Sequence, residues 1–133
     1  MNLSLDGYIA APGNDLRWSV PSDELLQWWS DRVHGNARLV TGDAVTEVNR
    51  LKAEDDGPMD LGGATLAAAA MRAGLIDEYA IVTHPVPVGG GTPFFTALGN
   101  WVHLNLVETR TFPDGVLVRF AWRAGLGCSF CQA

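Results

Sequence analysis

The stretch MDLGGATLAAAAMRAGLIDEY, residues 59–79, constrains the fold more than any other part of the chain. A short apolar approach ends in Gly62-Gly63, an alanine-rich segment follows at once, and Gly74 closes it. Alanine is the strongest helix former and glycine commonly ends helices, so the pattern predicts a helix between these glycines. The apolar run EYAIVTHPVPV that follows predicts a strand. Together they indicate an α/β protein.

Two roles are open for the glycine pair. A helix N-terminus has unpaired N–H groups and a partial positive charge, and glycine lets a phosphate approach the backbone. Thr65 adds a hydroxyl in the first turn. The pattern is neither the GK[ST] phosphate loop nor the G-x-G-x-x-G dinucleotide motif. From the residues alone, the pair is either a phosphate cradle or a tight turn from strand to helix.

The first half of the chain predicts two strands and two helices. Residues 3–13 read as a short strand entering a turn at 12–15, and residues 37–43 as a second short strand and a turn. The segment 20–35 reads as a helix that starts near Pro21, stops at Gly35, and turns a stripe of Leu25, Leu26, Trp28, Trp29 and Val33 to the core. The segment 43–54 reads as a helix capped by Asp43, and a turn follows at 55–58.

The C-terminal third predicts a β-hairpin. Segments 102–112 and 116–122 are rich in strand-forming residues and are joined by Pro-Asp-Gly at 113–115. Val102, Leu104 and Leu106 alternate with more polar residues, which predicts one buried side. With the strand–helix–strand units before it, the pattern predicts a mostly parallel sheet with an antiparallel edge.

Composition excludes some classes of partner. The formal charge is −6 and Lys52 is the only lysine, so we expect neither nucleic acid nor an anionic membrane as a partner.

The N-terminus lacks the basic start and apolar core of a signal peptide, which predicts the cytoplasm. Cys128 and Cys131 form one C-x-x-C without a second pair, so we expect no metal site. We expect a single domain over 1–123 and a disordered tail over 124–133.

A few further residues are candidates for ligand contacts. Asp6 either orients a ligand or simply precedes Gly7 in a turn. Trp18 is a candidate for stacking on a flat heterocycle, whereas Trp28 and Trp29 have core spacing. His84 is either a proton donor or a packing residue. The glycines at 89–91 either line a cofactor cleft, with Gly90 at the centre, or form a flexible connection.

Four segments in order resemble one superfamily: SLDGYIA, GGATLAAAAMRAGLIDEY, HPVPVGGGTPFF and LVETRTFPDGVLVRF. The chain resembles dihydrofolate-reductase-like proteins, and most closely the C-terminal reductase domain of bacterial riboflavin-biosynthesis deaminase-reductases. The resemblance spans most of residues 3–123. It implies a three-layer α/β fold with helices on both faces of the sheet, a homodimer, and NADPH as hydride donor. In riboflavin-type members the substrate is a ribosylamino-pyrimidine phosphate.

The resemblance also assigns roles to residues. It places the phosphates of NADPH at the glycine pair and the helix start, that is at Gly62, Gly63, Ala64, Thr65 and Leu66. It places Trp18 near the nicotinamide and substrate, beside the turn at Asp6 and Gly7. Asp23 resembles the acid that faces the pterin in dihydrofolate reductases.

The departures from the family pattern support a competing hypothesis. A strand–helix unit opening with Gly-Arg, then Thr and an acid, which contacts the far phosphates of NADPH, has no counterpart after the first helix. Leu61 stands where riboflavin-type members have an acid, and Asp60 is one step off. The chain is therefore either an NADPH-dependent reductase acting on a heterocycle or a small carbonyl or imine, or a non-catalytic dimeric scaffold or ligand-binding remnant. A third reading is an artificial fragment with uncovered apolar faces.

Overall fold

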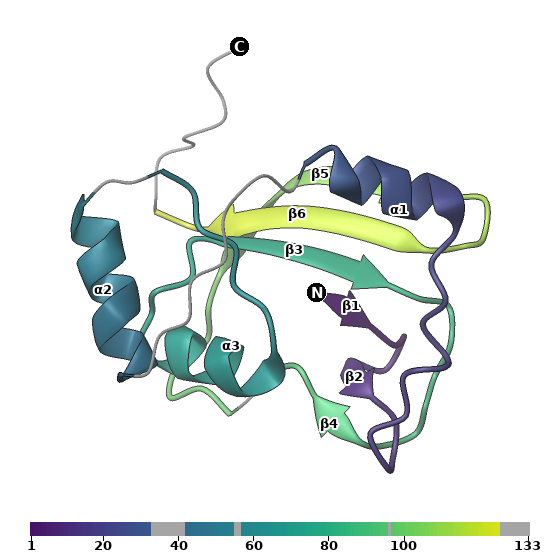
Figure 1. The fold of residues 1–133 in the computed structure, drawn as a ribbon, viewed down its shortest axis with the longest axis horizontal. Helices are drawn as coiled ribbons and strands as arrows, with labels where there is room; N and C mark the ends of the chain where they lie inside the picture. Colours follow the sequence, from purple (N-terminus) through teal and green to yellow (C-terminus); the bar gives the residue numbers. More distant parts are fainter. Residues whose placement is uncertain (33–41, 55–56, 96, 126–133) are drawn as a thin grey trace.

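The computed structural model describes residues 1–32, 42–54, 57–95 and 97–125. Its elements in chain order are β1 (Asn2–Leu3), β2 (Tyr8–Ala10), α1 (Asp23–Ser30), α2 (Ala44–Glu54), α3 (Ala64–Arg72), β3 (Glu78–Thr83), β4 (Thr92–Pro93), β5 (Leu104–Thr111) and β6 (Leu117–Arg123). A four-stranded sheet has the order β1-β3-β6-β5, and β2 pairs with β4 beside it. Along the longest axis, α1 lies toward one end and α2 and α3 toward the other (Figure 1).

The predicted α/β class is confirmed, but the prediction of a mostly parallel sheet is wrong. Among the described strands of this sheet, only β1 and β3 run parallel, with Leu3 opposite Thr83, whereas β3–β6 and β6–β5 are antiparallel. The C-terminal hairpin joins the sheet through β6, which lies between β3 and β5, so two of the three described pairings are antiparallel. Residues 37–41 of the expected second strand lie outside the described residues, and Gly42 and Asp43 are not in a strand.

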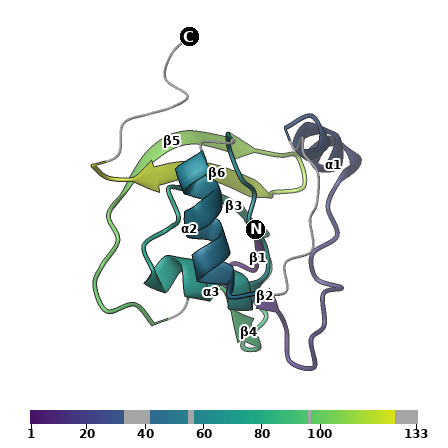
Figure 2. The same cartoon turned by 60° about the vertical axis from the view of Figure 1, so that its left-hand side comes forward.

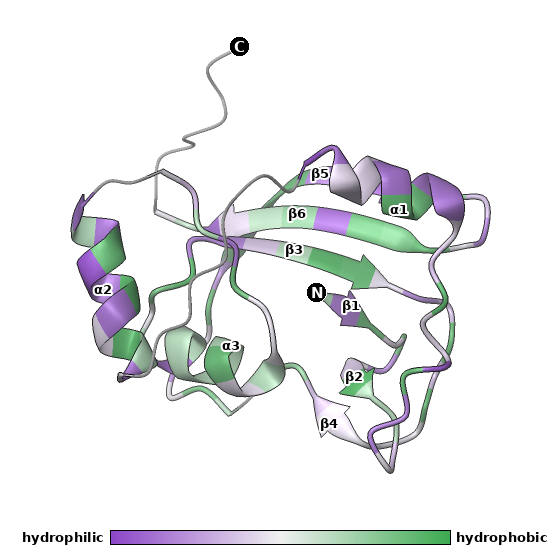
Figure 3. Ribbon diagram, viewed as in Figure 1, coloured by the Kyte–Doolittle hydropathy of each residue, from purple (hydrophilic) through white to green (hydrophobic). Residues whose placement is uncertain are grey.

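Two hydrophobic clusters lie on opposite faces of β3, because successive side chains of a strand point to opposite sides. Val82 packs with α1 in the first cluster, whereas Tyr79 and Ile81 pack with α3 in the second. The predicted helices on both faces are therefore confirmed. In Figure 3 the outward side of α1 is largely hydrophilic, whereas most of α3 is hydrophobic.

Helix α1 starts later than predicted. Ser22, rather than Pro21, precedes the first turn, and its side chain accepts a hydrogen bond from the N–H of Leu25 at 3.3 Å. Leu25 and Trp28 are buried as predicted, and Trp29 is half-buried. Leu26 is 50% exposed, so its assignment to the buried stripe is wrong: the buried side of α1 is set by Leu25 and Trp28, three positions apart, and Leu26 lies away from it. Val33 and the predicted stop at Gly35 lie outside the described residues.

Helices α2 and α3 agree with the sequence prediction. The N–H of Thr46 donates to the carboxylate of Asp43 at 2.8 Å, which confirms the predicted cap. Gly74 ends α3 in the left-handed conformation, with φ of 67°, and its N–H donates to Met71. The two helices lie side by side (Figures 1 and 2), and the Lys52 side chain ties α2 to Asp77 just before β3.

The C-terminal hairpin is confirmed, but its predicted buried side is not. The N–H of Phe112 donates to the carbonyl of Val116 across the turn at 2.9 Å. Leu106 is 63% exposed, because α3 packs over β1 and β3 and leaves this face of β5 open. The register between β5 and β6 shifts between Leu106 and Glu108, so Val107 is an extra residue in the outer strand.

Two of the predicted segments lie partly outside the described residues. These are the turn residues 55–56 and the part of the tail from 126 onward, with both cysteines. The division into a domain and a tail stays a prediction. None of the described helices combines the length and the apolarity needed to cross a bilayer.

Candidate functional site

The glycine pair places an uncapped helix terminus at the start of α3. Gly63 is the N-cap residue, with φ of 85° and ψ of 136°, and no side chain caps the helix. The first bond inside the helix runs from the N–H of Ala67 to the carbonyl of Gly63 at 2.9 Å. The N–H groups of Ala64, Thr65 and Leu66 therefore have no acceptor within the helix. A methyl group added at Gly63 would meet no atom within 4 Å, so the space above it is open.

The residues at this helix start are mostly exposed, and an acidic side chain lies nearby. Gly62, Gly63, Thr65 and Leu66 are exposed, and Ala64 is half-buried. Asp60 lies close enough to raise the pKa of Glu78, although burial of Glu78 is the larger cause. An anion would therefore be attracted by the helix dipole and the free N–H groups, against an acidic neighbour.

A hydrogen-bonded turn separates β1 from β2, where the sequence predicted one strand. Ser4 is buried, and its hydroxyl donates to Oδ1 of Asp6 at 2.6 Å while accepting from the N–H of Tyr8 at 2.9 Å. The carboxylate of Asp6 also accepts hydrogen bonds from the N–H groups of Val88 at 3.1 Å and Gly89 at 2.8 Å. The Ser4 hydroxyl first, and these N–H groups next, lower the pKa of Asp6 to about 2.

The loop that Asp6 contacts contains three consecutive glycines with positive φ, namely 73°, 157° and 119° at Gly89, Gly90 and Gly91. A Cβ at Gly91 would lie 2.0 Å from the carbonyl oxygen of Ala10, so only glycine fits there. Gly90 is half-buried between these neighbours. The loop is therefore held against β2 by its own backbone.

Trp18 and His84 form an aromatic pair beyond the carboxyl end of β3. Their ring centroids are 5.6 Å apart and their planes nearly perpendicular. The indole N–H of Trp18 donates to the carbonyl of Asp15 at 3.1 Å. His84 is 3% exposed, and burial lowers its pKa although Asp114 acts in the opposite direction. The imidazole is therefore neutral at neutral pH, which suits a packing or acceptor role better than proton donation.

Asp23 belongs neither to the hydrogen-bonded turn at Asp6 nor to the Trp18–His84 pair. It is an exposed residue in the first turn of α1, and within the described part of the chain it shares no hydrogen bond with Asp6 or Trp18. Its neighbour Ser22 instead meets Asp114 in the β5–β6 turn. Burial raises the pKa of Asp114, but hydrogen bonds from Val116 and Ser22 outweigh it, so the net shift is downward.

Comparison with known proteins places this geometry in a family. Residues 41–118 match the family model described as the RibD C-terminal domain. The chain belongs to this family. The match includes the glycine pair, α3, β3 and the glycine loop, and it ends within β6.

Individual relatives agree with this membership. YyaP, an uncharacterized protein of Bacillus subtilis, is 34% identical over 88 residues, which is 65% of this chain and 47% of YyaP. The chain thus spans about half the length of this curated relative. A crystal structure of a protein assigned to riboflavin biosynthesis from Shewanella sp. PV-4 has a TM-score of 0.71 at 21% identity, covering 92% of this chain and 96% of that one. That likeness shows a shared fold over nearly all of both chains.

A weaker structural likeness links the chain to a pyrimidine reductase-like protein from Corynebacterium diphtheriae. It has a TM-score of 0.47 at 18% identity, and covers 76% of this chain and 44% of that one.

Sequence reasoning missed the contact between the first turn and the glycine loop. The residues it joins are more than 80 positions apart, so no local pattern shows the pairing. The available signal was the order Ser4, Asp6, Gly7, because serine and aspartate two positions apart commonly bond within a turn. Among the described residues, no group of His, Cys, Asp and Glu side chains has the arrangement of a metal site.

Proposed function

We propose that this RibD C-terminal domain protein is an NADPH-dependent reductase that acts on a small heterocyclic, carbonyl or imine substrate. Family membership supports a riboflavin-biosynthesis reductase type. The observation that carries the proposal is the uncapped start of α3, where the residues fit a phosphate: Gly63 leaves open space, and three N–H groups lack acceptors within the helix. When bound, NADPH would supply the hydride.

The chain's own residues would bind NADPH and orient it toward the substrate. Gly62, Gly63, Ala64, Thr65 and Leu66 would hold phosphate oxygens through backbone N–H groups and the Thr65 hydroxyl. Gly90 would line the cleft that holds the cofactor. Trp18, packed edge-on against His84, would offer an aromatic surface at the reacting end. We place Asp6 and Asp23 at this end of the proposed site as well. Asp6 would act through the loop whose N–H groups it binds, and Asp23 would offer an exposed carboxylate.

We further propose that the active form is a homodimer in the cytoplasm. Leu104, Leu106 and Trp101 are 39%, 63% and 91% exposed near the outer strand, an apolar surface that a second copy would cover. A dimer would also offer additional contacts to the far phosphates of NADPH. Sedimentation with and without NADPH tests this part.

Calorimetry at low salt tests the cofactor site, with NADH as the control ligand. Gly63→Ala puts a side chain where φ is 85°, at the proposed phosphate site, and Gly57→Ala does the same at φ of 86°, just before Pro58 and outside that site. We expect both variants to be destabilised, by about 1–3 kcal/mol for a side chain at positive φ. Only Gly63→Ala should weaken NADPH binding, by at least about tenfold.

The outcomes separate the two readings of the chain. Micromolar binding that prefers NADPH and depends on Gly63 supports the reductase. If wild-type protein releases no heat up to millimolar NADPH, the glycine pair is only a turn and the chain is a scaffold of reductase ancestry.

A further inference from the structure

The carboxylate of Asp6 connects two loops that are far apart in sequence. Its Oδ1 accepts hydrogen bonds from the Ser4 hydroxyl and the N–H of Val88, and its Oδ2 accepts one from the N–H of Gly89. Three of the roughly four acceptor positions of a carboxylate are thus filled by this chain. A carboxylate so engaged is poorly placed to exchange a proton with a substrate.

The glycine loop depends on this carboxylate at its middle. Its ends are tied by backbone bonds, from the N–H of Leu5 to Val86 at 3.0 Å and from the N–H of Phe94 to Gly7 at 3.1 Å. Within the described residues, the only groups that bond the N–H of Val88 and the N–H of Gly89 are the two oxygens of Asp6. Since three successive glycines have little conformational preference of their own, the loop's shape is set from outside.

Asp15 provides an internal comparison. Its pKa is also lowered to about 2, chiefly by the Arg17 guanidinium, and it lies in the segment that follows β2. Its bonds, however, reach only two residues along the chain, at 2.9 Å to the N–H of Arg17 and 2.6 Å to its guanidinium. The ionised form is thus favoured for both Asp6 and Asp15. Asp6, however, binds a loop that is distant in sequence, whereas Asp15 binds only a residue two positions away.

We propose that Asp6 is a positioning residue that fixes the glycine loop at 89–91 for cofactor binding, without touching the reacting atoms itself. The structural half of this inference is independent of the activity, whereas its effect on NADPH rests on the proposed function. The Gly91 backbone, seated against Ala10, and the Asp6 carboxylate would then be the two fixed points between which Gly90 is presented.

Amide exchange and NADPH affinity test the inference on the full chain, in wild type, Asp6→Asn, Asp6→Glu and Asp15→Asn. Asparagine has the shape of aspartate but sets an NH2 group against one of the donors. We expect the Val88 and Gly89 amides to exchange at least about tenfold faster in Asp6→Asn and to be partly protected again in Asp6→Glu. The NADPH dissociation constant should rise about five- to tenfold in Asp6→Asn, with the melting temperature shifted no more than in Asp15→Asn.

The possible outcomes test the loop attachment, the positioning role and the proposed function separately. Unchanged exchange at Val88 and Gly89 overturns the loop attachment, and faster exchange with the affinity of Asp15→Asn overturns the positioning role. If Asp6→Asn does not fold, Asp6→Glu decides both. If wild-type protein binds no NADPH, the proposed function fails, while the exchange measurement still decides what Asp6 holds.

Discussion

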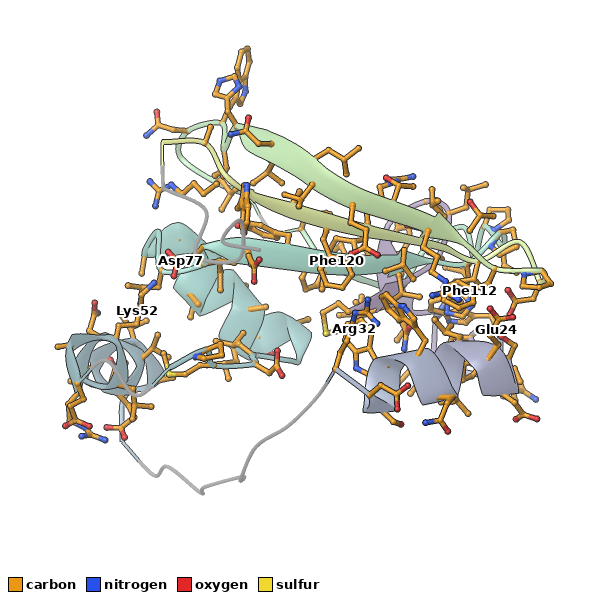
Figure 4. All side chains as sticks on the ribbon, turned by 90° about the horizontal axis from the view of Figure 1, so that it is seen from above. Glu24, Arg32, Lys52, Asp77, Phe112 and Phe120 are labelled. Atoms are coloured by element: carbon orange, nitrogen blue, oxygen red, sulfur yellow. The ribbon has the colours of Figure 1, made fainter. Side chains whose placement is uncertain are left out.

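The two faces of the central sheet are packed in opposite ways. On the α1 face, Trp28 meets Phe112 and Phe120 with centroids 5.7 Å apart in both pairs. The guanidinium of Arg32 lies over the Trp28 ring and that of Arg110 over the Phe112 ring. Arg32, Phe112 and Phe120 lie between α1 and the sheet in Figure 4. On the α3 face, the helix presents small residues instead, with Ala67 and Ala70 buried.

The difference separates stability from positioning. Large aromatic side chains bury much apolar area and dominate core energetics, so Trp28 of α1 should contribute more to stability than any single alanine of α3. Small side chains let a helix lie close to the sheet, so the α3 face determines where the helix start and its glycine pair stand. A bulky α3 would move the candidate phosphate site even if the chain still folded.

The largest effect should come from removing the centre of the α1 face. Trp28→Ala should lower the free energy of unfolding by about 3–5 kcal/mol, measured by urea denaturation. Leu26→Ala, at a residue of the same helix that is 50% exposed, is the control and should change it by about 0.5 kcal/mol or less. Equal losses in the two variants would show that the aromatic cluster contributes nothing special.

Enlarging the α3 face should cost less stability but more binding. Ala70→Leu adds volume at a residue 1% exposed and should destabilise by about 1–3 kcal/mol through overpacking. It should also weaken NADPH binding, because α3 moves away from the sheet. The matched control is Ala53→Leu at an exposed position of α2, where both quantities should stay near wild type. Full affinity in Ala70→Leu would break the proposed link between small residues and site position.

The pH dependence of stability should involve His84, at the end of the strand that separates the two faces. Burial lowers its folded pKa below the ordinary value of 6.5, so the unfolded chain takes up the proton first as pH falls. Its contribution is complete above pH 6.5 and is lost as pH falls toward the folded pKa, at no more than about 1.4 kcal/mol per pH unit. His84→Gln should flatten this part of the curve between pH 7 and 5. An unchanged slope in His84→Gln contradicts the assignment.

The smallest effect should come from the ion pairs around the α1 face. Glu24 and Arg110 are 3.0 Å apart with side chains about half exposed, so a double-mutant cycle should give about 0.2–1 kcal/mol, decreasing with salt. Arg32 and Glu108, at 3.9 Å, should give less. A coupling above 2 kcal/mol would make the charges, rather than the aromatic rings, the main support of α1.

Local patterns in the sequence were enough for several elements. Glycine on both sides of an alanine run located α3, Asp43 located the start of α2, and Pro-Asp-Gly located the hairpin, because each signal acts within a few residues. The motif order likewise indicated the family before any geometry was available.

Long-range features could not be read in the same way. Leu106 has the alternation of a half-buried strand, yet its exposure depends on how far α3 reaches, which no local rule specifies. The bonds from Asp6 to Val88 and Gly89 and the contact of Trp18 with His84 depend on how the segments meet in the fold. The roles proposed for Asp23 and Gly90 rest on the resemblance to the family, because no local pattern in the sequence assigns them.

The extra residue in β5 has a consequence for the solubility of the chain. On its outer side β5 has no partner strand among the described residues, and Leu104, Leu106 and Val107 are all exposed there. A regular strand of this kind is a template for edge-to-edge growth of aggregates. The register shift at Val107 interrupts the spacing of backbone donors and acceptors and increases the twist, so a second strand cannot pair along the whole edge. The register shift at Val107, together with the charged side chains of Glu108 and Arg110 in the same strand, thus makes the edge of β5 a poor template for pairing with another chain.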